Sequence, residues 1–245
     1  MKSRVRILLI GHSGQMGRAI SAAVESEPDL AITARCELGE KLDDKMRDVD
    51  VAIDFTQADA AELICATAVK KKVPLVIGTT GHSSKQRGKI DEAAKTIPVI
   101  YSPNFSVGVN TLFWLTRKTA ELLGDDFDLE IVEMHHRLKK DAPSGTAKRL
   151  TEILMEARRI DKIRHGRDGN VGERSGMEIG VHAVRGGDVV GDHTVIFAGG
   201  GERVELTHRA GSRATFAHGA LRAARWIIGR PAGLYSMQDV LGLSA

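Results

Sequence analysis

The segment Glu133–Ala147, EMHHRLKKDAPSGTA, concentrates residue types that could move a proton and hold an anion. It carries two adjacent histidines and two adjacent lysines, followed by a Ser-Gly-Thr turn. The residues concerned are His135, His136, Lys139, Lys140, Ser144, Gly145 and Thr146. Imidazole and ammonium groups can serve as general acids, and cations bind carboxylates. The segment therefore predicts a pocket for a small, acidic molecule that must be protonated.

The elements expected around this segment would place its side chains in one site. Residues 127–136 alternate apolar and polar side chains, which predicts a half-buried strand. Strand neighbours point to opposite faces, so His135 and His136 are not expected to bind one metal together. A helical pattern starts at Ala147, and the Ser-Gly-Thr turn stands where free backbone N–H groups and the helix dipole bind anions. The alternative is that Ser144 and Thr146 only cap the helix, but several cationic or titratable groups at one helix start favour a site.

A second motif lies near the N-terminus. Residues 4–10 form a short apolar strand that runs into the turn Gly11–Gly17 and then into a helical pattern over 18–25. Strand, glycine-rich turn and helix form the phosphate-binding corner of a dinucleotide fold, although the spacing here is G-x-x-G-x-x-G. A further strand, 30–36, ends at Glu37, whose carboxylate would accept hydrogen bonds from ribose hydroxyls. A plain tight turn is the alternative, and the ordered set of elements favours the cofactor.

Composition favours a cytoplasmic enzyme. The 245 residues are 42% hydrophobic, and no apolar run reaches the roughly 18 residues of a membrane span. The apolar run near the N-terminus is too short for a signal peptide. Only Cys36 and Cys65 are present, which fits a reducing compartment. A net charge of +3 and 4% aromatic residues argue against nucleic acid as a partner.

The first half of the chain alternates strands with helices. Strands are expected at 49–55, 74–77 and 99–101, and helices at 58–71 and 84–95. This alternation predicts a parallel sheet with right-handed crossovers, whose ligands bind at the carboxyl ends of the strands. The loops expected at those ends are 54–56, 78–81 and 102–106.

The second half of the chain has a different pattern. Helices are expected at 109–123 and 147–158, a mobile loop at 164–176, and strands at 177–184, 189–198 and 203–210. The connections 185–188 and 199–202 are predicted to be hairpin turns. A last helix over 215–228 and a tail at 234–243 are expected to pack on the first domain. We therefore predict an α/β fold with a dinucleotide-binding domain, 1–106 and 217–245, and an inserted substrate-binding domain, 107–216.

At this point a resemblance is specific. The segment EMHHRLKKDAPSGTA resembles the signature of the 4-hydroxy-tetrahydrodipicolinate reductase (dihydrodipicolinate reductase) family of bacterial lysine biosynthesis. The segments GHSGQMG, IDFT, VIGTTG, NFSVGVN and GERVELTHRA resemble further motifs of that family, so the resemblance extends over nearly the whole chain. It implies a Rossmann domain, an α+β domain with a mixed open sheet, and a homotetramer assembled through those sheets. It also implies NAD(P)H-dependent reduction of 4-hydroxy-tetrahydrodipicolinate to tetrahydrodipicolinate.

The resemblance also implies roles for individual residues. His135 would be the proton donor or acceptor, with Lys139 as a second proton donor beside it. The carboxylates of a small dicarboxylate substrate would be bound by His136, Ser144, Gly145 and Thr146. The cofactor would be lined by Gly11, His12, Ser13, Gly14, Gln15, Met16, Glu37, Gly78, Thr79, Thr80, Ser102, Pro103, Asn104 and Phe105.

One departure from the family concerns the choice of cofactor. Many members carry arginine where this chain has Gln15 and Leu38, and such arginines can pair with the 2′-phosphate of NADPH. Glu37 without these cations favours the bare ribose of NADH. Because Arg18, Arg35 or Lys41 could substitute, we expect the chain to use both NADH and NADPH, with a preference for NADH.

Two other functions are compatible with parts of the sequence. One is a sensor or regulator that binds a dinucleotide on the same fold without turnover; the proton donors and the anion-binding turn argue against it. The other is a metal-dependent hydrolase. The nine histidines show neither H-x-x-x-H nor H-x-H spacing, so no metal site is predicted.

Overall fold

The computed structural model describes residues 4–243. Residues 1–3 and 244–245, which the predicted first domain includes, lie outside this range. The chain divides into two compact units. Unit 1 consists of Met1–Val107 together with Arg213–Ala245, and unit 2 of Gly108–Ser212.

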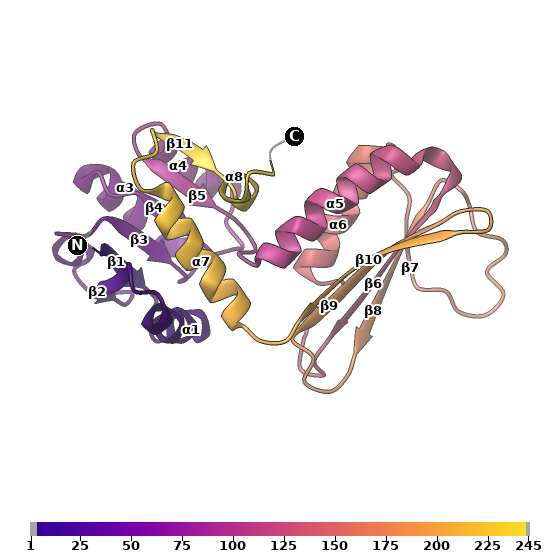
Figure 1. The fold of residues 1–245 in the computed structure, drawn as a ribbon, viewed down its shortest axis with the longest axis horizontal. Helices are drawn as coiled ribbons and strands as arrows, with labels where there is room; N and C mark the ends of the chain where they lie inside the picture. Colours follow the sequence, from indigo (N-terminus) through magenta and orange to yellow (C-terminus); the bar gives the residue numbers. More distant parts are fainter. Residues whose placement is uncertain (1–3, 244–245) are drawn as a thin grey trace. The chain divides into compact units, whose positions relative to one another are not determined.

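Unit 1 is built on sheet A, a six-stranded sheet with the order β11-β5-β4-β3-β1-β2 (Figure 1). All of its strand pairs are parallel, as the alternation of strands and helices predicts. The strands are β1 (Val5–Ile10), β2 (Leu30–Cys36), β3 (Val51–Asp54), β4 (Leu75–Ile77), β5 (Pro98–Tyr101) and β11 (Gly233–Tyr235). The expected return of the C-terminal tail is confirmed, since β11 extends this sheet beside β5.

Helices cover both faces of sheet A. On β1, Ile7 and Leu9 pack against one helical layer while Leu8 and Ile10 pack against the other, because successive strand residues alternate. The first layer contains α1 (Gln15–Ala23), α7 (Ala214–Ile227) and α8 (Met237–Leu241), and the second contains α3 (Ala61–Lys71) and α4 (Ser84–Ala94), with the short α2 (Leu42–Lys45) beside β2. Burial on both faces explains why these strands are almost continuously apolar. Across residues 4–243, no helix is long and apolar enough to cross a membrane.

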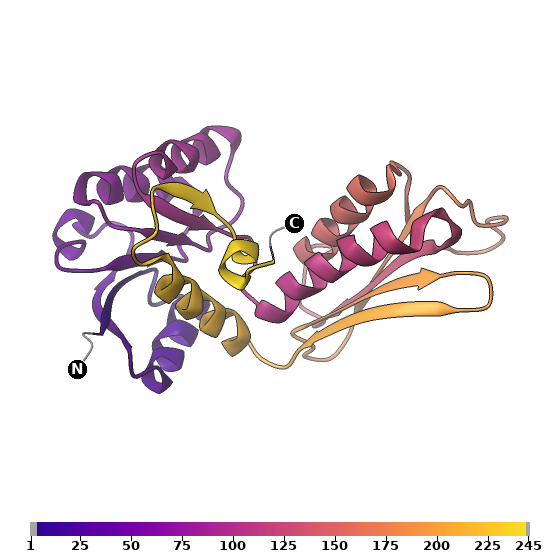
Figure 2. The ribbon, with the colours of Figure 1, turned by 45° about the horizontal axis from the view of Figure 1, so that its top comes forward.

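Unit 2 contains sheet B, a five-stranded sheet with the order β10-β9-β6-β8-β7. Its strands are β6 (Asp128–His135), β7 (Ile163–His165), β8 (Ile179–Arg185), β9 (Gly191–Ala198) and β10 (Arg203–Ala210). Strand β6 pairs in parallel with β8 and antiparallel with β9, so the predicted mixed sheet is confirmed. Both helices, α5 (Val107–Leu123) and α6 (Gly145–Arg158), lie on the same face of this sheet (Figure 2).

The prediction of a hairpin turn at 185–188 is wrong. Strands β8 and β9 do not pair with each other, because β6 lies between them. The loop after β8 instead passes the carboxyl end of β6, where the Gly186 N–H donates to the His135 carbonyl oxygen at 3.0 Å. A glycine pair indicates a turn, but it does not tell which strand the chain joins after the turn. The hairpin at 199–202 is confirmed by the antiparallel pairing of β9 with β10.

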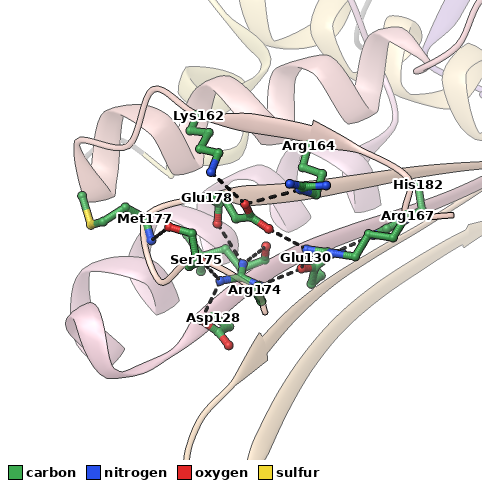
Figure 3. Close-up of polar contacts among 11 residues, drawn as sticks. Asp128, Glu130, Lys162, Arg164, Arg167, Arg174, Ser175, Met177, Glu178 and His182 are labelled. Carbon is green, nitrogen blue, oxygen red and sulfur yellow. Dashed lines mark hydrogen bonds and ion pairs between the residues drawn. The ribbon is translucent and has the colours of Figure 1, made fainter. Parts of the chain in front are cut away.

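The segment 164–176 also differs from the mobile loop expected there. It begins within β7, and two arginines tie it to β6 (Figure 3). Arg167 donates to both oxygens of Glu130 and to Glu178, and Arg174 donates to Asp128 and Glu130. The glycines and charges of this segment, considered alone, predict a mobile loop. No local pattern indicates its ion pairs, because the β6 carboxylates that pair with Arg167 and Arg174 lie far away in the sequence.

Two helical glycines give a matched test of packing. A Cβ on Gly219 of α7 would lie 1.7 Å from the Phe105 carbonyl oxygen, whereas a Cβ on Gly88 of α4 would meet no atom within 4 Å. Gly219→Ala should therefore lower the free energy of unfolding by about 1–3 kcal/mol. Gly88→Ala should raise it by about 0.5–1 kcal/mol, because alanine has the better helix propensity. Urea unfolding of both variants measures this, and equal changes would contradict the close approach at Gly219.

Candidate active site

The buried face of β6 changes from apolar to polar toward its carboxyl end. Leu129 and Ile131 are followed on the same face by Glu133 and His135. Glu133 is completely buried and His135 is 8% exposed. The alternating pattern that predicted the strand therefore places a carboxylate and an imidazole side by side, at positions i and i+2.

The Glu133 carboxylate has three partners. Its Oε2 lies 2.6 Å from Nδ1 of His135, and its Oε1 accepts the backbone N–H of Ser144 at 3.0 Å. The Arg185 guanidinium donates to both oxygens, at 2.8 and 2.9 Å, and also to the Asp141 carbonyl oxygen at 2.7 Å. A buried carboxylate is tolerated only when its charge is paired and its oxygens are hydrogen-bonded, which these contacts achieve.

These contacts set the protonation of both groups. Burial alone would raise the pKa of Glu133, but the hydrogen bonds from Arg185, His135 and the Ser144 N–H together hold that pKa below its usual value. Burial lowers the pKa of His135, and Lys139 and Arg185 lower it further, while Glu133 opposes the change. Near pH 7 Glu133 is therefore ionised and His135 is mainly neutral, and a bound anion would raise the pKa of the imidazole.

His193 of β9 is a further member of the cluster. Its Nε2 lies 2.9 Å from the Ser144 Oγ, and its ring meets that of His135 edge-on, with the centroids 5.1 Å apart. Burial, with a smaller contribution from His135, lowers the pKa of His193 to about 4. The imidazole is therefore a neutral hydrogen-bonding group at physiological pH.

Sequence reasoning missed three members of this cluster, namely Glu133, Arg185 and His193. For Glu133 and His193 a signal was available, because strand alternation places each of them on the buried face of its predicted strand. Glu133 shares that face with His135, and His193 shares it with Val195. Arg185 was taken for a turn residue, and only the pairing of β6 with β8 brings it opposite His135.

The turn that the sequence predicts to bind anions lies at the start of α6. Ser144 is the N-cap residue, and its Oγ accepts the Ala147 N–H at 3.2 Å. A Cβ on Gly145 would meet no atom within 4 Å, so the backbone at the helix start is open to a ligand. Lys139 pairs with Asp141 at 2.8 Å, and its side chain is 20% exposed. Thr146 lies in the first turn of α6.

His136 stands apart from His135. It directly follows the last residue of β6 and is half-buried, and its backbone N–H donates to the Val189 carbonyl oxygen at 2.7 Å. The structure thus brings His135 and Ser144 together through Glu133, and Lys139 lies close enough to affect the pKa of His135.

In unit 1 the glycine turn after β1 has the geometry of a phosphate-binding corner. Gly11 has a φ of +80°, and a Cβ there would lie 2.8 Å from the Phe55 carbonyl oxygen. A Cβ on Gly17 would lie 2.2 Å from the Gly11 carbonyl oxygen, so only glycine allows α1 to start this close to the turn. The N-cap Gly14 has no side chain to cap α1, and the first turn of the helix holds no acidic residue. The N–H groups of this helix start fit a pyrophosphate.

Glu37 faces this turn from the end of β2. Its Oε1 accepts the Ser13 N–H at 2.7 Å and lies 3.4 Å from Nε2 of His12. The hydrogen bond from Ser13 lowers the pKa of the carboxyl below its usual value. Because both contacts use Oε1, Oε2 can accept a hydrogen bond from a ribose hydroxyl. The helix start and the Glu37 carboxylate at this corner therefore fit the pyrophosphate and a ribose of a dinucleotide.

The remaining predicted cofactor residues lie at the carboxyl ends of neighbouring parallel strands. Asp54 is buried and joins two of these loops, because it accepts the hydroxyls of Thr56 at 2.6 Å and Thr79 at 2.9 Å. Burial raises the pKa of Asp54 although these hydroxyls oppose the change. The loops hold Gly78, Thr79 and Thr80 after β4, and Ser102, Pro103, Asn104 and Phe105 after β5. Gln15 and Met16 open α1.

Phe105 belongs to the core more than to this surface. Its side chain is 2% exposed and meets the ring of Phe55 edge-on, with the centroids 5.6 Å apart. Any part of Phe105 in cofactor binding therefore falls to its backbone. Among the described residues, no three His, Cys, Asp or Glu side chains are grouped so that they could hold a metal ion.

Comparisons with known proteins cover both units. A family model described as dihydrodipicolinate reductase, N-terminus, matches residues 5–105, and its C-terminal counterpart matches residues 108–241. The 4-hydroxy-tetrahydrodipicolinate reductase of Akkermansia muciniphila is 54% identical over 243 residues, which cover 98% of this chain and 99% of that protein. The enzyme of the same name from Hahella chejuensis is 46% identical over 264 residues, which cover 97% of this chain and 99% of that protein.

Solved structures show the same fold. The dipicolinate-bound dihydrodipicolinate reductase from Paenisporosarcina sp. TG-14 has a TM-score of 0.79 at 24% identity and covers 96% of this chain and 98% of that one. The C. glutamicum DAP dehydrogenase in complex with DAP has a TM-score of 0.58 at 15% identity, with coverage of 99% and 96%. The similarity to the Paenisporosarcina structure confirms the predicted α/β architecture.

The low pKa of His193 predicts how stability changes with pH. Its pKa is about 4 in the folded protein against 6.5 for an ordinary histidine, so only the unfolded chain takes up a proton between these values. Its contribution to stability is complete above pH 6.5 and is lost as the pH falls toward 4, by on the order of 3 kcal/mol.

Urea unfolding from pH 7 to pH 4 measures this loss. His193→Gln, which does not titrate, should show a flatter dependence on pH than the wild type, whereas the exposed His165→Gln should follow the wild type. Parallel curves for the wild type and His193→Gln would contradict a neutral, buried His193.

Proposed function

The chain belongs to the dihydrodipicolinate reductase family, and we propose on that premise that it reduces 4-hydroxy-tetrahydrodipicolinate to tetrahydrodipicolinate with NADH or NADPH. The reaction serves diaminopimelate and lysine biosynthesis, and the family resemblance noted in the sequence is confirmed. The comparisons offer no support for a non-catalytic sensor on the same fold.

One observation in unit 2 carries the chemical part of the proposal. The Glu133 carboxylate binds both the imidazole of His135 and the backbone of Ser144 at the start of α6. A proton donor and an anion-binding helix start are thereby held in one cluster. Dipicolinate, bound in the Paenisporosarcina structure, is a ring with two carboxylates and belongs to the class of ligand that such a cluster fits.

The residues of unit 2 divide into two groups in the proposed reaction. The backbone N–H groups at Gly145 and Thr146, the Ser144 turn and the side chain of His136 bind the substrate carboxylates. Lys139, now paired with Asp141, supplies a cation and a second proton donor. His135 or Lys139 protonates the ring where negative charge develops, and the 4-hydroxyl group leaves as water.

The residues of unit 1 hold the dinucleotide in this proposal. The pyrophosphate binds across Gly11, Ser13 and Gly14 at the start of α1, and Glu37 accepts the ribose hydroxyls. The loops after β4 and β5 line the rest of the cofactor, and the link between Asp54 and Thr79 keeps the first of these loops in place. The bound nicotinamide supplies the hydride.

The proposal also includes an assembly and a location. The face of sheet B opposite α5 and α6 carries half-buried apolar side chains, such as Val132, Met134 and Ile196, and we infer a homotetramer built through these faces. Both cysteines, Cys36 and Cys65, are free and buried, which supports the cytoplasm as the location.

A coupled assay tests the proposed function. The substrate is formed in the cuvette from aspartate semialdehyde and pyruvate by the enzyme that condenses them, and NADH oxidation is followed by its absorbance. We expect oxidation that depends on this chain and on both precursors. Binding of NADH without oxidation would instead support the sensor.

Alanine substitutions test the two proton donors. His135→Ala and Lys139→Ala should each lower kcat by roughly 10²- to 10⁴-fold, the usual effect of losing a general acid. NADH binding, measured by fluorescence titration, should survive because both residues lie in unit 2. His165→Ala, an exposed histidine of the same unit, is the matched control. Near wild-type rates in both test variants would refute the assigned roles.

Glu37 should decide the preference between the two cofactors. A 2′-phosphate would meet the Glu37 carboxylate, and the Arg18 guanidinium on this turn already donates to the Ser13 carbonyl oxygen at 2.5 Å. We expect kcat/KM for NADH to exceed that for NADPH severalfold. Glu37→Gln should reduce the difference by improving NADPH, while Glu62→Gln on α3 should not. A strong preference of the wild type for NADPH would contradict this prediction.

A further inference from the structure

A carboxylate is energetically unfavourable at the buried position of Glu133. It continues the buried row of Leu129 and Ile131 on β6, where an aliphatic side chain would pack without losing hydration. Replacing buried charges by apolar side chains of similar size is often neutral or stabilising. The fold of sheet B therefore gives no reason for a carboxylate here, whereas its contacts point toward the candidate site.

The contacts of Glu133 join three elements of unit 2. They reach His135 on β6, the backbone of Ser144 before α6, and Arg185 at the end of β8. The two parallel hydrogen bonds from the Arg185 guanidinium are the strongest arrangement that an arginine makes with a carboxylate. Both oxygens are engaged, so the carboxylate has a fixed orientation.

We propose that Glu133 is a positioning residue for the reduction: it holds His135 with Nδ1 protonated, so that Nε2 is the nitrogen that exchanges a proton with the substrate. Arg185 keeps the carboxylate ionised, so that Glu133 orients the imidazole without taking its proton. This inference rests on the proposed function, because it takes His135 as the proton donor.

The protonated nitrogen follows from the chemistry of the contact. An ionised carboxylate can only accept hydrogen bonds, so Nδ1 of His135, 2.6 Å away, must carry a hydrogen. Nε2 is then the lone-pair nitrogen of the neutral ring and becomes the acidic N–H of the cation. A Cβ on Gly191 would lie 3.0 Å from this Nε2, so glycine at this position of β9 keeps a side chain from crowding that edge of the ring.

Four ionisable groups face His135 from the surrounding elements. Glu133 on β6 favours the charged imidazole, while Arg185 on β8 and Lys139 after β6 disfavour it. The neighbouring His193 on β9, with its pKa of about 4, is neutral over the pH range of the assay. Removing the anion and removing the Arg185 cation should therefore change the proton affinity of His135 in opposite directions.

Glu133→Gln tests the positioning role. Its amide oxygen can still accept the Ser144 N–H, but it offers His135 no negative charge. We expect kcat to fall roughly 10²- to 10⁴-fold, the range for general acid catalysis and for the loss of an orienting carboxylate beside a catalytic histidine, with a change in substrate KM below about threefold. Since the protonated His135 is the acid, kcat falls as pH rises through its pKa, and this alkaline limb should move to lower pH.

Arg185→Met is the second variant, and it keeps the carboxylate beside His135. Loss of the cation should move the alkaline limb of kcat to higher pH, opposite to Glu133→Gln. The matched control is Glu130→Gln, the same change on the same strand, because Glu130 pairs with Arg167 and Arg174 on the other face. Its limb should stay at the wild-type pH.

The coupled assay of the wild-type enzyme distinguishes a failure of the proposed function from a failure of the positioning role of Glu133. If it does not oxidise NADH with substrate, the proposed function fails. If it does, three results would overturn the positioning role: a Glu133→Gln profile like the wild type, limbs of Glu133→Gln and Arg185→Met that move in the same direction, or the same shift in Glu130→Gln. Should Glu133→Gln not fold, the direction of the Arg185→Met shift still decides.

Discussion

The geometry of the candidate site in unit 2 depends on one buried carboxylate. Glu133 has no contact with solvent, and its charge is balanced by Arg185 through two hydrogen bonds. Because a buried charge without partners is unfavourable by several kcal/mol, the partners of Glu133 must stay where they are. The strand carrying His135, the start of α6 and the end of β8 are thereby held in one arrangement. This constraint gives the cluster the preorganisation that proton transfer requires.

Unit 1 reaches its functional geometry by steric fit. At Gly11 and Gly17 a single methyl group would collide with backbone atoms, so the turn and α1 come as close as main chains allow. Glu37 then contacts the turn through the Ser13 N–H. Charge pairing in one unit and close backbone packing in the other thus create the features to which the proposed function assigns its two tasks, protonation of an acid in unit 2 and binding of a dinucleotide in unit 1.

Much of this could be predicted from sequence, because the signals are local. The alternation of apolar and polar residues predicted β6, the short apolar runs predicted the strands of sheet A, and the glycine spacing predicted the turn before α1. Prediction failed where contacts are distant in the sequence. Arg185 was assigned to a hairpin because nothing local shows that β6 separates β8 from β9. Arg167 and Arg174 looked mobile because Glu130 is far from them in the chain. Phe105 lies in a motif loop, yet its ring is buried in the core.

The central claim is that Glu133 fixes the imidazole of His135 with Nδ1 protonated. Histidine side-chain ¹⁵N NMR of the wild-type protein tests it directly, above the pKa of the ring, with His135→Gln to assign the signals. If Glu133 holds the imidazole in this way, His135 has a protonated Nδ1 and an unprotonated Nε2. A neutral ring protonated at Nε2 would contradict it, because Glu133 would then not be the acceptor that orients the proton donor.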